Sequence, residues 1–168
     1  MRVVTVLDHE STAVQHILVT KSNIALCYCK LGRHEQALNL RREIYARVVA
    51  LGVSGDDLFI DVLNLGWSMI QTHRCAEAKS FLRKQLPAAR RTLGADHDTA
   101  IQLRWSYACC LCKDADASRD DAAEAVSLLE ELSRTTQRIY GTSHPLATDI
   151  RTTLGRAQEK LAAFDTSK

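Results

Sequence analysis

Small residues recur along this chain at a nearly constant spacing, and this spacing constrains the fold more than any other feature. Ala25, Gly66, Ala108 and Gly155 are separated by 41, 42 and 47 residues. The last three each stand 14 residues after a glycine that ends an amphipathic stretch. A chain with such a period folds as a stack of similar units, because one unit cannot bury its own apolar face.

Each unit is predicted to contain two antiparallel amphipathic helices. Around Ala25 the apolar residues return at helical spacing. A second small residue follows 12 residues after the first in two units, as Ala37 does after Ala25, and such pairs let two helices cross closely. Gly32 can adopt the left-handed conformation that ends the first helix. In the third unit the second small residue is Ala125, 17 residues after the first, which indicates an insertion at 114–119.

The segment LGRHEQA at residues 31–37, with NIA at 23–25 before it, resembles the tetratricopeptide repeat. The period and the link GTSHP at 141–145 resemble the longer repeats of kinesin light chains, and LGADHDT at 93–99 is a degenerate copy of that link. The resemblance covers about residues 12–164. It implies an all-α fold, a right-handed solenoid of antiparallel helix pairs with about seven helices.

The resemblance also predicts the domain organisation. The repeat domain is expected at 12–164, and residues 1–11 form a poorly defined N-terminal segment or the remnant of an earlier repeat. Three units are expected at about 12–56, 57–96 and 97–144, followed by a capping helix at 145–163 and a tail at 165–168. The expected helices span 12–31, 34–51, 57–72, 75–93, 97–113, 119–140 and 145–163.

Two positions depart from the repeat pattern. His73 stands where a turn glycine is expected. Pro87 falls inside the fourth helix, where it should kink the helix or weaken one turn. Both departures concern local conformation and leave the predicted fold unchanged.

Composition and charge exclude several classes of protein. Only seven glycines and two prolines occur in 168 residues, which excludes a sandwich or barrel of many short strands. No apolar run approaches the ~18 residues of a membrane span. The charge is +5 up to Gly94 and −3 beyond it, without the clustered basic face that nucleic-acid binding requires. We therefore expect neither a membrane nor a nucleic acid as a partner.

The six cysteines raise the question of metal binding and catalysis. Their two clusters, Cys27 with Cys29 and Cys109 to Cys112, lie within helices, and residues two apart on a helix point in different directions. Small buried side chains are the favoured interpretation, with reduced thiols in a cytoplasmic protein and neither metal nor cofactor. No phosphate-binding loop or nucleophile turn is present, so we expect no enzyme. The equivalent residues His97 and His144 are expected to cap the helices that follow them.

The resemblance implies that the first helix of each unit lines a concave, peptide-binding groove. The predicted groove residues are Val19, Ser22, Asn23, Leu26, Lys30, Ile60, Leu63, Asn64, Trp67, Ile70, Gln71, Gln102, Trp105, Cys109, Lys113 and Arg156. Trp67 is the expected anchor of a ligand, since a half-exposed tryptophan offers a large contact area. The alternative, that both tryptophans pack between helices, stays open at this stage.

The groove chemistry narrows the kind of peptide. Asn23 and Asn64 stand where some arrays hold a peptide backbone or terminal carboxylate. The clamp of chaperone-binding arrays also needs a lysine one turn earlier, where this chain has Val19, so chaperone-tail recognition is not expected. An apolar groove flanked by Lys30, Lys113 and Arg156 suits a segment with apolar anchors and some acidic character.

The sequence thus predicts a non-catalytic protein–protein interaction module, or scaffold, that binds a peptide segment of a partner. One alternative is a structural unit that stacks or oligomerises within a larger array, with self-association and an exposed apolar face on the first helix. A remote alternative is a thiol- or metal-dependent activity of the cysteine faces.

Overall fold

The protein consists of seven α-helices in a computed structural model that describes residues 2–166, with side chains described for residues 13–166. The helices are α1 (Arg2–Lys30), α2 (His34–Ala50), α3 (Asp56–Gln71), α4 (Cys75–Leu93), α5 (Asp98–Lys113), α6 (Arg119–Tyr140) and α7 (Pro145–Thr166). No strand occurs among these residues. The predicted all-α fold is confirmed, and the ends of α2 to α6 lie within one residue of the expected positions.

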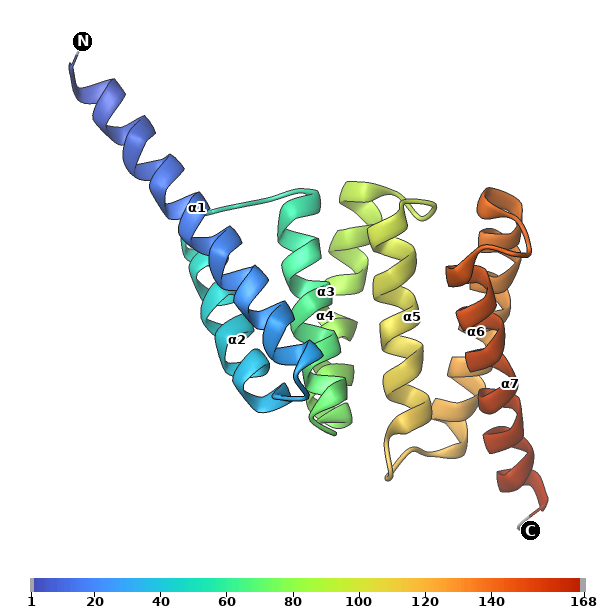
Figure 1. The fold of residues 1–168 in the computed structure, drawn as a ribbon. Coiled ribbons are helices and arrows are strands. Elements are labelled where there is room, and N and C mark those ends of the chain that lie inside the picture. The colour runs from blue at the N-terminus through green and yellow to red at the C-terminus, as the bar shows by residue number, and fades with distance from the viewer. Residues whose placement is uncertain (1, 167–168) are drawn as a thin grey trace.

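The helices form antiparallel pairs that stack side by side into a solenoid (Figure 1). Each helix packs on the next one in the chain, and α5 also packs on α3 and on α7. The even-numbered helices lie further apart and meet through long side chains, as Tyr45 of α2 does with Phe81 of α4. The odd-numbered helices therefore form one layer and the even-numbered helices the other. None of the helices described is both long and apolar enough to cross a membrane.

The recurring small residues mark close helix crossings, as the period predicted. Ala25, Ala37, Ala108 and Ala125 are fully buried. At Gly66 an added Cβ would lie 2.9 Å from Cδ2 of Leu82, so any larger residue would force the buried Leu82 side chain to shift. Gly155 in the last helix differs, because no atom lies within 4 Å of the place of its Cβ.

The turn inside each of the first two helix pairs keeps one conformation despite the change of residue. Gly32 has a φ of 72°, and His73 has a φ of 60° although it carries a side chain. After each of them an arginine N–H donates to a carbonyl five residues earlier, Arg33 to Tyr28 and Arg74 to Met69. The unusual histidine thus adopts the strained left-handed region instead of changing the loop.

The histidines of the two links cap helices, which confirms their predicted role. The N–H of Thr99 donates to Nδ1 of His97 at 3.3 Å, and the N–H of Leu146 donates to Nδ1 of His144 at the same distance. Both bonds satisfy an N–H that has no partner in the first turn of a helix.

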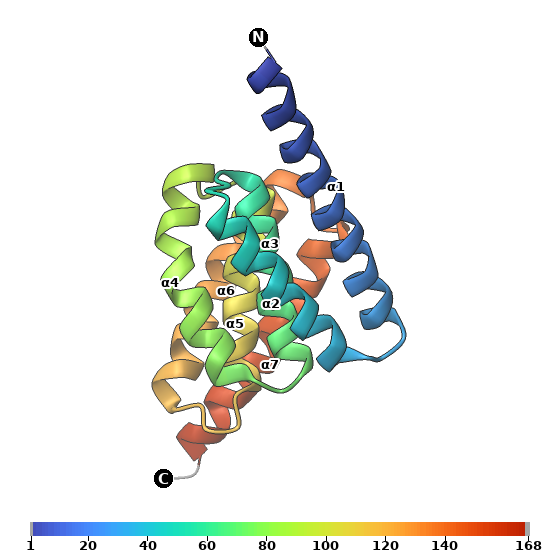
Figure 2. The ribbon, with the colours of Figure 1, turned by 90° about the vertical axis from the view of Figure 1, so that its left-hand side faces the viewer.

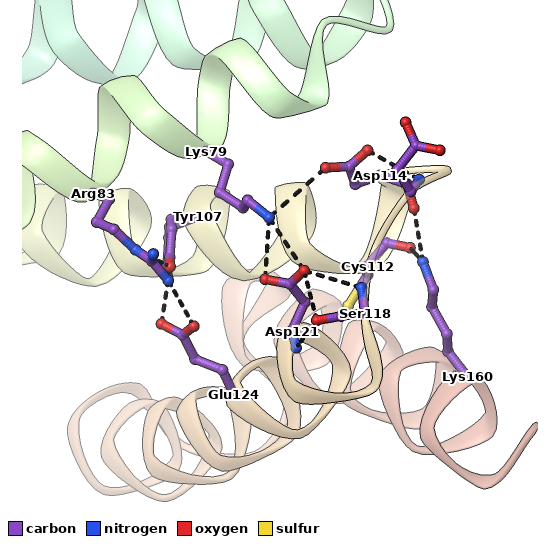
Figure 3. A network of polar contacts seen from close by, with 10 residues as sticks. Lys79, Arg83, Tyr107, Cys112, Asp114, Ser118, Asp121, Glu124 and Lys160 are labelled. Carbon is purple, nitrogen blue, oxygen red and sulfur yellow. Dashed lines mark hydrogen bonds and ion pairs between the residues drawn. The ribbon is translucent and has the colours of Figure 1, made fainter. Parts of the chain in front are cut away.

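The connection between α5 and α6 is held by ion pairs from α4 and by hydrogen bonds from α7 (Figure 3). Lys79 of α4 lies 3.1 Å from the carboxylate of Asp121, which forms a capping box with Ser118. Lys160 of α7 donates to the backbone carbonyls of Cys112 and Asp114 at 2.8 and 2.9 Å. The inserted residues therefore fasten α4 and α7 to the α5–α6 pair.

Helix α1 is the longest helix and the least covered. It begins at Arg2, whereas the sequence predicted a start near residue 12. It packs on α2, but its described residues make no close backbone contact with α3, and its N-terminal half extends past the other helices (Figures 1 and 2). Ala25 is the one buried residue among its described side chains. By contrast, α4 runs unbroken through Pro87, which lies exposed on the surface.

Candidate peptide-binding groove

The predicted groove residues fall into three groups by exposure. The exposed ones are Val19, Asn23, Leu26, Lys30, Ile60, Gln71, Lys113 and Arg156. The half-buried ones are Ser22, Asn64, Trp67, Gln102 and Trp105. The remaining three, Leu63, Ile70 and Cys109, are buried.

These three buried residues correct the prediction. Leu63, Ile70 and Cys109 belong to the hydrophobic core, with 9%, 2% and 5% of their surface exposed. They lie on α3 and α5. These two helices pack directly on each other, and the contact covers part of the predicted groove face of each helix. Their side chains stabilise this contact and are not available to a ligand.

A cleft of about 410 Å³ separates α1 from α3 and has α2 as its floor. It brings together four of the predicted residues, namely Val19, Ser22, Asn23 and Ile60, and a small hollow that adjoins it at Ser22 adds Asn64. Its walls are largely apolar, because Leu18, Val48 and Val53 also face it. The other predicted groove residues lie outside this cleft.

Sequence analysis missed the charged side chains here: Asp57 and Asp61 of α3 line the cleft, and Arg41 of α2 lines the small hollow that adjoins it at Asp61. Burial lowers the pKa of the Arg41 guanidinium and raises the pKa of the Asp61 carboxyl. Nε of Arg41 is buried without a hydrogen-bond partner, and its Nη2 lies 4.0 Å from Sγ of Cys29. Arg41 thus retains an unused donor beside the cleft.

The repeat register shows why these two charges are unusual. Arg41 occupies the position of Leu82 in the second unit and Leu129 in the third, and both leucines are fully buried. Asp61 occupies the position of Leu103, which is also fully buried. The boundary between the first two units therefore carries charges where the next boundary carries leucines. This difference could have been found in the sequence by aligning the units on their recurring small residues and comparing the positions on either side.

The two tryptophans lie between core and surface. Trp67 and Trp105 are half-buried, and their rings meet edge to face with centroids 5.2 Å apart. Nε1 of Trp105 donates to Oγ1 of Thr153, while the described residues offer no hydrogen bond to Nε1 of Trp67. Both rings pack against the core cluster and retain exposed surface. Both rings therefore pack partly between helices, and the role of Trp67 as a ligand anchor stays a prediction.

Among the six cysteines, Cys75, Cys109 and Cys110 are buried and Cys112 is half-buried. All six thiols are free, and burial raises the pKa of Cys109 to about 12 and also raises the pKa of Cys110 and Cys112. A thiol must ionise before it can act as a nucleophile or as a metal ligand, so burial opposes both uses. No group of three histidine, cysteine or acidic residues that could hold a metal ion occurs among the residues described.

Comparison with known proteins supports the repeat assignment. Residues 115–146 match the family model of the tetratricopeptide repeat, a range that includes α6 and the GTSHP link. Among solved structures, the chain is similar to a variant of the nearly identical TPR-like repeats of a Podosopora anserina protein described as a kinesin light chain. The identity is 16%, the match covers 84% of this chain and 85% of that one, and the TM-score is 0.45. No curated protein sequence matches the chain.

Proposed function

We propose that this chain, of which residues 115–146 match the tetratricopeptide repeat, binds a peptide segment of a partner protein in the cleft between α1 and α3. Tetratricopeptide repeats are in general modules of protein–protein interaction and are typically non-catalytic. The observation that carries the proposal is the charged pair Arg41 and Asp61 in a place where the next unit boundary has leucines. Proteins keep half-buried charges at a cost in stability, and such departures cluster at functional sites.

The lining of the cleft indicates how a peptide would bind. Val19 and Ile60 are 60% and 42% exposed on opposite walls and can hold apolar side chains of an extended or helical segment. The amides of Asn23 and Asn64 can each donate to and accept from a peptide backbone. The half-buried guanidinium of Arg41 carries five N–H donors and can donate to a carboxylate or a backbone carbonyl.

The remaining predicted groove residues extend the site. Trp67 lies one helical turn after Asn64 on α3, so a segment that leaves the cleft along α3 reaches its exposed ring edge. Lys30, Lys113 and Arg156 are exposed, and cations at such positions favour a ligand with some acidic residues. Apolar anchors with acidic neighbours are therefore the preferred chemistry. The six free thiols fit a protein of a reducing compartment such as the cytoplasm.

Selection from a library of random 12-residue peptides displayed on phage tests this function on the full chain. Peptides with apolar anchors and acidic residues should be enriched, and fluorescence polarisation should show at least tenfold weaker binding to Asn64→Ala and Arg41→Gln variants. Arg42→Gln is the matched control, because Arg42 pairs with Glu77 on the surface away from the cleft. Enriched peptides that bind these variants as well as the parent would place the binding site elsewhere.

A further inference from the structure

Helix α1 carries an exposed row of uncharged residues on the side away from the cleft, and two of them, Ile17 and Ile24, also border shallow hollows between α1 and α2. We define the α1 seam as Ala13, Ile17, Thr20, Ile24, Cys27 and Leu31, which follow one another at alternating spacings of four and three. All six are exposed, and the three large ones have 56%, 43% and 68% of their surface exposed. In Figure 2, which faces the N-terminal end of the array, no helix covers α1. This is the spacing at which two helices pair along a shared seam.

Several equivalent positions in the later units are buried. Ile24 corresponds to Leu65 in α3 and to Tyr107 in α5, which are 3% and 2% exposed. Ile17 corresponds to Ala100 in α5 and Ala147 in α7, which are 3% and 1% exposed. In each later unit the preceding even-numbered helix packs on this side. Among the described residues, no helix covers the corresponding face of α1.

The other end of the array offers no matching face. The outward positions of α7 are polar, with Asp149, Arg151, Thr152, Gln158 and Glu159 all exposed. A head-to-tail stack would place the apolar seam of one copy against this polar helix. A contact between the α1 seams of two copies covers each seam with apolar surface. Because the same surface is used on both copies, such a contact produces a dimer and no larger assembly.

Large and small residues alternate along the seam in a way that makes it complementary to itself. Suppose that the α1 helices of two copies run antiparallel and that the two-fold axis passes next to residue 22. Ile17 then lies opposite Cys27 of the second copy, Ile24 opposite Thr20, and Leu31 opposite Ala13. Every large side chain then meets a small one, which is how facing layers interdigitate. We infer that two copies of this chain form a two-fold symmetric dimer through antiparallel pairing of their α1 seams.

Charge and area agree with this occupant. The seam holds no charged residue, and its neighbour Lys21 already pairs with Glu43 of α2 at 3.0 Å, so pairing two copies brings no strong like-charge contact. The seam is about 28 Å long at the rise of an α-helix. A helix pair of this length buries roughly 1,000 Å² in total, which is the lower end of specific interfaces and corresponds to a concentration-dependent dimer.

Analytical ultracentrifugation of the full chain over a range of concentrations tests the dimer. The mass should rise from 18.7 kDa to about twice that value and no further. Ile24→Glu should raise the dissociation constant at least tenfold, and Thr20→Glu should do the same without removing a large side chain. Val19→Glu is the control, because Val19 is just as exposed but lies on the cleft side of α1. Circular dichroism verifies that each variant is folded.

Cysteine cross-linking tests the antiparallel register. Ile17→Cys should form an intermolecular disulfide with Cys27 of a second copy under mild oxidation, and Cys27→Ser should abolish it. Val19→Cys should form none. A monomer at all concentrations, a dimer that Ile24→Glu leaves intact, a cross-link from Val19→Cys but not from Ile17→Cys, or growth beyond two copies would each overturn the inference. These readouts involve no peptide, so their failure leaves the proposed groove function standing.

Discussion

Replacing Arg41 and Asp61 together by leucine is expected to stabilise the protein while it abolishes peptide binding in the cleft. The double substitution gives the first unit boundary the residues of the second, where Leu82 and Leu103 are fully buried in the core. The cause lies in solvation. Burial raises the pKa of the Asp61 carboxyl and lowers the pKa of the Arg41 guanidinium, so each charged form is less stable in the folded chain than in water.

The magnitude follows from the partial burial of the two groups. Exchange of a fully buried ion pair for well-packed apolar side chains is neutral or stabilising by up to about 4 kcal/mol. Arg41 and Asp61 are only half-buried, so solvent screens part of the penalty and about 1–2 kcal/mol is expected. For a chain of this length, that gain raises Tm by roughly 2–8 °C. The effect needs both substitutions, because Arg41→Leu alone leaves Asp61 beside Asp57 without its counter-charge.

Thermal and urea unfolding at pH 7, followed by circular dichroism, measure this change together with the two single variants. Arg42→Leu serves as the control, since Arg42 forms a surface pair with Glu77 and its loss should change stability by less than about 0.5 kcal/mol. A double variant that is less stable than the parent would show that Arg41 and Asp61 form a net stabilising pair. It would also remove the argument that function maintains them.

The remaining predictions address the crossings, the insertion and the tryptophan pair. Gly66→Ala should destabilise by about 1–3 kcal/mol through overpacking, whereas Gly155→Ala should stabilise by up to about 1 kcal/mol in the same urea titration, because only the first site is crowded. Lys160→Met should cost about 1.5–3 kcal/mol by removing two charged hydrogen bonds to carbonyls, and an unchanged urea midpoint would contradict this role. A backbone hydrogen bond from Ser118 and the nearby Lys79 lower the pKa of the Asp121 carboxyl, so Asp121 stabilises the fold above about pH 4 and loses this contribution as the pH falls below that. Between pH 3 and 6, the urea midpoint of an Asp121→Asn variant should therefore depend less on pH than that of the parent. Trp67→Ala should cost about 1–3 kcal/mol of stability, less than a core tryptophan, and weaken binding of a selected peptide at least tenfold; a stability loss with unchanged affinity would make the ring a packing residue alone.

The sequence alone was sufficient to predict the helices, the crossings and most of the turns. Helix ends depend on local signals such as Gly32 and on the caps at His97 and His144, and the structure has all three in the expected roles. The close crossings depend on a period of small residues that a sequence displays directly. The domain boundaries at 12 and 164 stay predictions.

The groove was predicted less completely, because a helical period shows which face a residue occupies but not how closely the next helix covers that face. Leu63, Ser22 and Trp105 share one position of the repeat, yet only Leu63 is buried. Its burial accompanies the close packing of α3 on α5, whereas Ser22 stands on α1, which lies apart from α3.

The separation of α1 from α3 is the feature that only the tertiary structure decided. Local propensity makes α1 a helix whether or not a neighbour covers it, so its sequence does not show which of its faces stay open. The charges of Arg41 and Asp61 resist full burial, and the α1 seam is exposed because no described helix packs beyond it. The formation of a helix is determined within a segment of some ten to thirty residues. The cleft, by contrast, depends on side chains that the fold brings together from three separate helices.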